Sequence, residues 1–180
     1  MMNNIYYEAP TYLVDTAEWT TTPFETRKEV VKYIDNQVKY PSRYNLKHTE
    51  GYWNEQGKIW QNTGSYPRYM PKSLDFKRHW DFEKEKCKFD GFIIYKSIKD
   101  NTEFALPCLM YFYLNYCPIV DKVKAKIDLP EIYDGDYHYF LYILRCILHR
   151  KYGVVLKKRQ AGYTLKNMSI LLNAIWFGSA

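Results

Sequence analysis

KYGVVLKKRQAGYTLKNMS, residues 151–169, is the stretch that the rest of the chain leads up to. It begins with a short apolar run, in which Val154 to Leu156 predicts a buried strand of a parallel sheet. A basic turn of small residues, Lys157 to Thr164, follows it, and Leu165 to about Phe177 predicts an apolar helix. Strand, turn and helix in this order form the usual cradle for the phosphate groups of a nucleotide.

A further helix precedes this stretch. Asp134-Gly135-Asp136 predicts a turn and a helix cap, and Tyr137 to Arg150 has apolar residues at helical spacing. Helix, strand, turn and helix together predict an α/β fold, in which residues 131–180 begin a P-loop NTPase domain with a parallel sheet flanked by helices. One strand cannot form a sheet, so we expect its other strands to come from elsewhere.

The first 130 residues predict a mixed α+β arrangement in two segments. Residues 1–72 form a Tyr- and Asn-rich arm that is irregular up to residue 21 and has one helix, capped by Thr22 with Pro23 and Glu25 in its first turn and ending near Val38. Aromatic residues recur at 53–69 among polar residues, and they fit either an arm pinned onto a core or a surface on which bases stack.

Residues 73–130 predict a helix and a hairpin. Ser73 caps a helix that runs to about Lys88, with Leu74, Trp80 and Cys87 facing inward and the charged run 83–86 in solvent. Strands are expected at 91–96 and 103–106, followed by an apolar helix or strand at 107–117 and a basic connector at 118–130.

Charge and cysteine content narrow the classes of function. The chain has 180 residues and a net charge of +6, and no Asp or Glu follows Asp136. Seven basic residues do follow it, which favours a surface for polyanions over a merely solvated face: Arg145, Arg150, Lys151, Lys157, Lys158, Arg159 and Lys166. The four cysteines are widely spaced and predict reduced, mostly buried thiols and no zinc site. No apolar run is long enough for a membrane span, and the N-terminus does not resemble a secretory signal.

The basic turn departs from the standard phosphate-loop pattern G-x-x-x-x-G-K-[ST]. Gly162 and Thr164 fill the second glycine and the hydroxyl position, whereas Tyr163 replaces the lysine and Lys157 replaces the first glycine. Backbone N–H groups from Lys158 to Thr164 can still face phosphate oxygens, and Lys157 can reach them from the other end of the loop. The same residues also fit an ordinary strand, turn and helix with a basic surface turn.

Four blocks of sequence, in order, resemble the large terminase subunit of tailed bacteriophages, the ATPase that pumps DNA into proheads. They are similar to the family's W-x-x-E-x-x-R-C-x-x-G block with Lys86 for arginine, its Y-F-x-L-N-F-x-P-I block, its P-x-F-x-D-x-D-Y-x-Y-F entry to the ATPase and its V-L-K-x-R-Q-x-G-[FY]-[ST] loop. The matching residues are 80–91, 111–119, 130–140 and 155–164. Residues 1–72 match nothing in this family.

The resemblance implies a role for each residue of the loop. Lys157 is expected to be the phosphate lysine and Thr164 the ligand of Mg²⁺, with ATP as the nucleotide. The intervening loop residues are Lys158, Arg159, Gln160, Ala161, Gly162 and Tyr163. His138 stands nearest to the position where the family reads adenine with a glutamine, although a packing histidine fits equally well.

The resemblance also implies partners and a location: double-stranded phage DNA, the portal, a small terminase subunit, a ring of identical subunits, and the cytoplasm of the bacterial host. Hydrolysis of ATP needs an acidic Mg²⁺ partner and a carboxylate that activates water, and a nuclease needs clustered carboxylates. Because no acid follows Asp136, we expect an N-terminal fragment that neither hydrolyses ATP nor cuts DNA by itself. The alternatives are a non-enzymatic nucleic-acid-binding module and a structural protein with an incidental basic turn.

Overall fold

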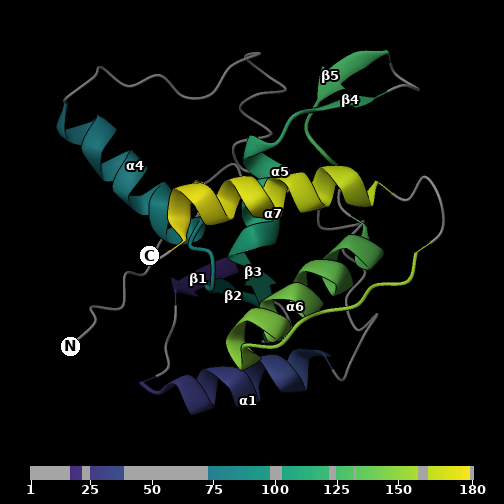
Figure 1. The fold of residues 1–180 in the computed structure, drawn as a ribbon. Coiled ribbons are helices and arrows are strands. Elements are labelled where there is room, and N and C mark those ends of the chain that lie inside the picture. The colour runs from purple at the N-terminus through teal and green to yellow at the C-terminus, as the bar shows by residue number, and fades with distance from the viewer. Residues whose placement is uncertain are drawn as a thin grey trace.

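Helices and two small antiparallel sheets form a mixed α/β architecture in the structure, which is a computed structural model (Figure 1). It describes residues 17–21, 25–38, 73–97, 103–121, 125–131, 133–157 and 162–178. Both sheets are antiparallel, whereas the sequence predicts the start of a parallel sheet; within the described residues, no parallel pairing occurs.

The larger sheet has three strands in the order β1-β2-β3. β2 (Phe92–Ser97) and β3 (Glu103–Pro107) form the predicted hairpin, with Phe92 opposite Pro107. β1 (Ala17–Thr21) pairs with the other edge of β2. The sequence predicts an irregular segment there, and this is wrong, because the long-range pairing with β2 that makes the segment a strand leaves no local signal.

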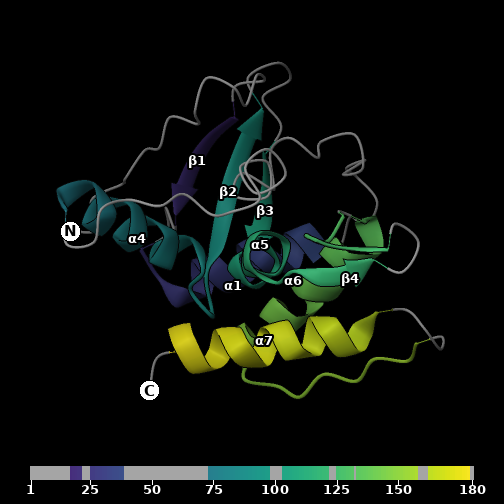
Figure 2. The same cartoon turned by 90° about the horizontal axis from the view of Figure 1, so that it is seen from above.

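Helix α5 (Cys108–Tyr116) occupies the middle of the molecule, as Figure 2 shows. It starts directly after β3, where the Cys108 N–H donates to the carbonyl of Gly91 at 3.0 Å. Nearly all of its side chains are buried, from Cys108 to Asn115. A helix that is apolar on all sides is stable only when it is surrounded, and α5 contacts the hairpin, α4, α6 and α7.

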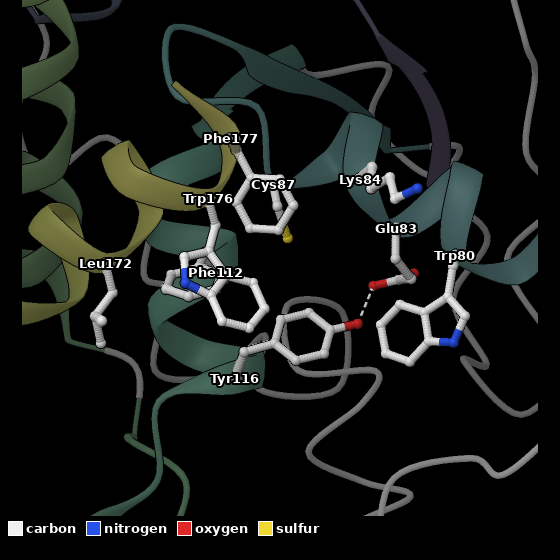
Figure 3. Close-up of a pocket in the computed structure, with 9 residues that line it drawn as sticks. All are labelled: Trp80, Glu83, Lys84, Cys87, Phe112, Tyr116, Leu172, Trp176 and Phe177. Carbon is white, nitrogen blue, oxygen red and sulfur yellow. Dashed lines mark hydrogen bonds between the residues drawn. The ribbon is translucent and has the colours of Figure 1, made fainter. Parts of the chain in front are cut away.

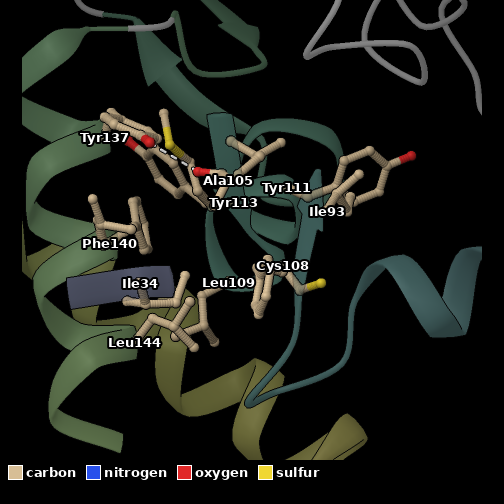
Figure 4. Packing of buried hydrophobic residues seen from close by; sticks show 14 of the residues in the cluster. Ile34, Ile93, Ala105, Cys108, Leu109, Tyr111, Tyr113, Tyr137, Phe140 and Leu144 are labelled. Atoms are coloured by element: carbon tan, nitrogen blue, oxygen red, sulfur yellow. Dashed lines mark hydrogen bonds between the residues drawn. The ribbon is translucent and has the colours of Figure 1, made fainter. Parts of the chain in front are cut away.

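The hydrophobic core gathers side chains from α1, the hairpin, α5 and α6 (Figure 4). Phe140 and Leu144 of α6 face Leu109 of α5, and all three are at most 1% exposed. Burying a side chain of this size contributes about 1.5–3 kcal/mol. Tyr137 also satisfies its polar end, since its hydroxyl donates to the carbonyl of Ala105 at 2.9 Å.

Helix α1 (Arg27–Val38) ends where the sequence predicts but begins later. The predicted cap at Thr22 and Pro23 lies outside the described residues, and the structure places the capping box at Thr26 and Glu29. Glu29 accepts from the Thr26 N–H at 3.3 Å, and Thr26 Oγ1 accepts from the Glu29 N–H at 3.4 Å. The same reciprocal pattern, four residues further on, therefore starts the helix.

Helix α4 (Leu74–Lys86) begins at the predicted cap, since Ser73 Oγ accepts from the Phe76 N–H at 3.1 Å. Two details of its predicted faces are wrong. Leu74 is 60% exposed, whereas Glu83 and Lys86, predicted to lie in solvent, are at most 3% exposed. The charged residues lie on the side of α4 that packs against α5, where the hydroxyls of two tyrosines meet Glu83.

The remaining elements lead to the candidate site. The connector predicted at 118–130 contains a hairpin of β4 (Ile119–Asp121) and β5 (Lys126–Asp128). Helix α6 (Asp134–His149) then forms where a helix is predicted, but residues 134–136 are its first turn rather than a turn and cap before it, and it ends at Arg150, whose φ of 55° is left-handed. After an extended segment comes α7 (Tyr163–Phe177), which crosses α5 on the outer side of the molecule (Figure 2).

Candidate functional site

The segment before the loop is extended, but it is not the predicted buried strand. Val154 is 80% exposed, Val155 37% and Leu156 96%, and the segment has no strand pairing within the described residues. A strand needs a neighbour for its backbone groups. Here the Val154 N–H donates instead to the hydroxyl of Tyr142 on α6, at 3.1 Å.

The loop is described only at its two ends. Lys157 is exposed, and Lys158, Arg159, Gln160 and Ala161 lie outside the described residues, so the roles predicted for them stay predictions. At the other end Gly162 caps α7 with a φ of 67°, in the left-handed region that glycine adopts at little cost. The second glycine of the phosphate-loop pattern therefore has a conformational reason to be glycine.

Tyr163 and Thr164 belong to the first turn of α7 rather than to the loop. The Tyr163 ring packs edge-on against Tyr139 of α6, with ring centroids 4.8 Å apart. Thr164 is exposed. The tyrosine that stands at the usual lysine position thus anchors α7 to α6, while the hydroxyl proposed to bind Mg²⁺ faces solvent.

Two lysines approach the same tyrosine ring. Lys157 Nζ lies 6.0 Å from the centroid of Tyr163, and Lys166 Nζ lies 4.7 Å from it. The lysine at the start of the loop therefore returns to the helix that follows the loop. That Lys157 binds phosphates from the start of the loop stays a prediction, whereas for Lys166 the sequence predicts only a place in the basic surface.

Lys166 forms a buried ion pair with Asp136 in the first turn of α6. The two residues are 6% and 8% exposed. Burial raises the pKa of the Asp136 carboxyl above its ordinary value, and the hydrogen bond and charge of Lys166 offset part of this rise. The sequence predicts Asp136 only as part of a helix cap, because nothing local indicates a partner 30 residues away.

Helix α6 carries His138 on the side that faces away from the start of α7. Its ring packs edge-on against Tyr137, with centroids 5.5 Å apart. Two residues along a helix correspond to a rotation of about 200°, so His138 lies on the opposite side of α6 from Asp136, which faces α7. Contact of His138 with adenine stays a prediction without support from this geometry.

A second candidate site is an aromatic pocket of about 380 Å³ between α4, α5 and α7 (Figure 3). Its ring-bearing walls are Trp80, Phe112, Tyr116, Trp176 and Phe177. Such a volume with mostly apolar walls is typical of small-molecule sites. Trp80 and Tyr116 come from two of the blocks that resemble terminases, so the pocket joins two motifs that lie apart in the sequence.

A buried polar cluster closes one side of this pocket. Glu83 accepts hydrogen bonds from Lys86 Nζ at 3.1 Å and from the hydroxyls of Tyr111 at 2.9 Å and Tyr116 at 2.5 Å. Lys86 Nζ also lies 4.5 Å from the centroid of Phe82. The positive charge of Lys86 is therefore neutralised within the cluster, so we interpret the cluster as part of the packing between α4 and α5 rather than as a binding site.

The cysteines Cys87 and Cys117 lie where burial acts on their thiols. Burial raises the pKa of Cys117 to about 12 and the pKa of Cys87 well above its usual value, so both thiols stay protonated at neutral pH and are poor nucleophiles. Among the described residues, no cluster of three or more His, Cys, Asp or Glu is placed to hold a metal ion. None of the described helices is long and apolar enough to cross a membrane.

The comparisons with known proteins assign no relative. No protein-family model matches the chain, and neither a curated protein nor a solved structure matches it at a significant level.

Proposed function

We propose that this chain is the nucleotide-binding N-terminal part of a viral DNA-packaging ATPase that resembles the large terminase subunit. One observation supports the proposal most directly. Lys157, at the start of the loop, lies beside the first turn of α7, which follows the loop, and its Nζ is 6.0 Å from the centroid of the Tyr163 ring. A lysine displaced from its standard position can thus still reach phosphates held at Gly162 and the first turn of α7.

In this proposal the loop binds ATP with Mg²⁺. Backbone N–H groups between Lys157 and Thr164 would face the phosphate oxygens, and the positive end of the α7 dipole would add to their attraction. Thr164 would ligate Mg²⁺ through its hydroxyl, which the exposed position of that residue permits. The activity that we propose for this chain is therefore the binding of ATP with Mg²⁺.

Exposed apolar surface supports a larger assembly around the loop. Val154, Leu156, Ile175 and Trp176 are each at least 68% exposed, and both their segments lie along one outer edge of the molecule in Figure 2. Exposed apolar side chains gathered on one side mark surfaces that become covered. We propose that the remaining strands of a parallel P-loop sheet pair with 154–156 and cover this side.

The same proposal names the wider context. Binding of ATP would be coupled to movement of double-stranded phage DNA into proheads, in the cytoplasm of the bacterial host. The partners would be the portal, a small terminase subunit and further copies in a ring.

The test is ATP binding by the 180-residue chain and its Lys157→Ala and Thr164→Ala variants, measured by calorimetry with and without Mg²⁺. Lys157→Ala should weaken binding about tenfold or more, the size expected for a charged hydrogen bond. Thr164→Ala should weaken it only when Mg²⁺ is present. Lys151→Ala, which removes an exposed lysine just before the apolar run, is the matched control and should change nothing. Unchanged affinity in both loop variants would refute the proposal.

A second candidate is a non-enzymatic module that binds single-stranded nucleic acid. The aromatic pocket favours it, since Trp80 and Trp176 offer ring faces on which bases stack. It predicts binding of single-stranded DNA that weakens with salt, persists in Lys157→Ala and is lost in Trp176→Ala. A purely structural protein would bind neither ATP nor DNA.

A further inference from the structure

The two tryptophans of the aromatic pocket come from helices far apart in the sequence, and they lie at opposite sides of the pocket in Figure 3. Trp80 belongs to α4 and Trp176 to the last turn of α7, with the Tyr116 ring of α5 between them in this view. The Trp80 and Tyr116 ring centroids are 6.5 Å apart, and Phe112 stacks on Tyr116 at 6.0 Å. Trp176 is 73% exposed, so much of its ring is available to a ligand.

The charges of the pocket walls cancel in pairs. Among the described residues that line the pocket, the charged ones are Glu83 and Lys84. Glu83 is 3% exposed, and its carboxylate accepts from Lys86 Nζ at 3.1 Å. Lys84 is exposed, and its Nζ lies 3.6 Å from the carboxylate of Asp81. These walls therefore carry no net charge, and a charged group placed between them would lose hydration without gaining a partner.

The volume and the ring geometry of the pocket indicate the size and shape of its ligand. An apolar cavity of about 150 Å³ holds one benzene ring, so the 380 Å³ of this pocket have room for about two or three fused rings. Aromatic rings prefer offset-stacked or edge-on contacts with other rings. The walls offer both kinds of surface, because Phe112 stacks on Tyr116 and meets Phe177 edge-on at 5.8 Å. A flat aromatic molecule therefore gains more here than a saturated molecule of the same size.

We propose that the aromatic pocket binds a free small molecule that is flat, aromatic and uncharged. The inference goes beyond the proposed function, because it uses neither the loop nor its lysine. A single strand of nucleic acid also presents flat rings, but its phosphates need cations. The one cation that lines the described part of the pocket is Lys84, and Asp81 lies beside it. An uncharged small molecule therefore fits these walls better than a polyanion.

The test is the binding of coumarin, a flat and uncharged molecule of two fused rings, to the 180-residue chain at pH 7, measured by calorimetry. Octahydrocoumarin, its saturated analogue, should bind about three- to tenfold more weakly, since it makes no ring-to-ring contacts. Coumarin carboxylate and a coumarin that bears a trimethylammonium group should bind at least about tenfold more weakly, because each brings a charge to the pocket. Failure of coumarin to bind, equal binding of octahydrocoumarin, or tighter binding of either charged analogue would overturn the inference.

Variants of α7 test whether coumarin binds in this pocket. Trp176→Leu removes a ring but keeps an apolar side chain, and it should weaken coumarin binding about tenfold, as expected for the loss of one stacking contact. Leu172→Glu brings a charge to the pocket wall and should weaken binding to a similar extent. Leu171→Glu is the matched control, since Leu171 and Leu172 are 54% and 44% exposed but only Leu172 lines the pocket. Neither leucine is buried, so both variants should fold, and equal effects of the two glutamates would contradict binding at this place.

Two further measurements separate this ligand from nucleic acid and from ATP. Coumarin binding should be the same at low and high salt, and oligothymidylate should not displace coumarin. Displacement by oligothymidylate that weakens with salt would assign the pocket to nucleic acid and overturn the inference. A wild-type chain that binds coumarin but not ATP would refute only the proposed function, whereas one that binds ATP but not coumarin would refute only this inference.

Discussion

Replacing Glu83 with glutamine should strongly destabilise the protein, because it removes the negative charge from a buried cluster. Lys86, which is 1% exposed, would lose the carboxylate charge that neutralises it at 3.1 Å. Breaking a buried ion pair in this way costs about 3–5 kcal/mol. Glutamine keeps one oxygen for the tyrosine hydroxyls, and the Phe82 ring beside the ammonium group offsets about 1 kcal/mol. We therefore expect a loss of about 2–4 kcal/mol in the free energy of unfolding, a large share of the roughly 5–15 kcal/mol that holds a domain together.

Helix α4 contains its own control for this prediction. Lys84 and Asp81 have the same i, i+3 spacing, but their side chains are 63% and 57% exposed. Asp81→Asn should therefore change the free energy of unfolding by less than about 0.5 kcal/mol. Urea unfolding at pH 7, followed by far-ultraviolet circular dichroism, measures both variants.

The double variant Glu83→Gln/Lys86→Met sharpens the test. Neutral residues of similar size leave no buried charge, so this variant should recover most of the stability that Glu83→Gln loses. The reasoning is refuted if Glu83→Gln costs no more than Asp81→Asn, or if the two substitutions at 83 and 86 simply add.

Two further predictions concern α6 and the turn before α7. Burial would raise the pKa of Asp35, but the hydrogen bonds and charges of Arg145 and His149 outweigh it and lower this pKa below 3.8. Asp35 therefore contributes stability that is present above pH 3.8 and is lost as the pH falls through the lower pKa of the folded state. Urea unfolding should show the difference in the free energy of unfolding between the wild type and Asp35→Asn shrinking over that pH range. Gly162→Ala should destabilise the chain by about 1–2 kcal/mol, because the φ of 67° at Gly162 is left-handed. Gly135 lies in the first turn of α6 with open space around it, so Gly135→Ala should stabilise the chain by up to about 1 kcal/mol. Thermal melts of the two variants should shift in opposite directions, and a shared direction would contradict this account.

Elements with a strong local signal could be predicted from the sequence. Helix α6 has its apolar stripe, α4 has its cap at Ser73, and the β2–β3 hairpin has two β-rich runs around a turn. The strands β1, β4 and β5 could not, since each is short and is defined by a partner. Local propensity and periodicity determine the first group, while long-range pairing determines the second.

The buried charges of α4 show where a usable signal was overlooked. Phe76, Trp80, Glu83 and Cys87 are spaced at i, i+4, i+7 and i+11, so Glu83 lies within the apolar stripe of the helix. When residues 83–86 are treated as one charged run, the position of Glu83 on the apolar face of the helix is overlooked. The partners could not be predicted, because the hydroxyls of Tyr111 and Tyr116 come from another helix.

The candidate site also has parts that the sequence predicts and parts that it does not, and Tyr163 shows the reason. The loop pattern alone counts Tyr163 as a lost lysine, because a pattern compares positions and not directions. In the structure the ring packs against Tyr139 of α6, and this contact fixes the start of α7 beside Asp136. The tyrosine thereby creates the place where Lys157 arrives from one end of the loop and Lys166 from within the helix. A lysine at position 163 could not pack in this way, so the departure from the standard pattern and the new positions of the ammonium groups are one structural feature.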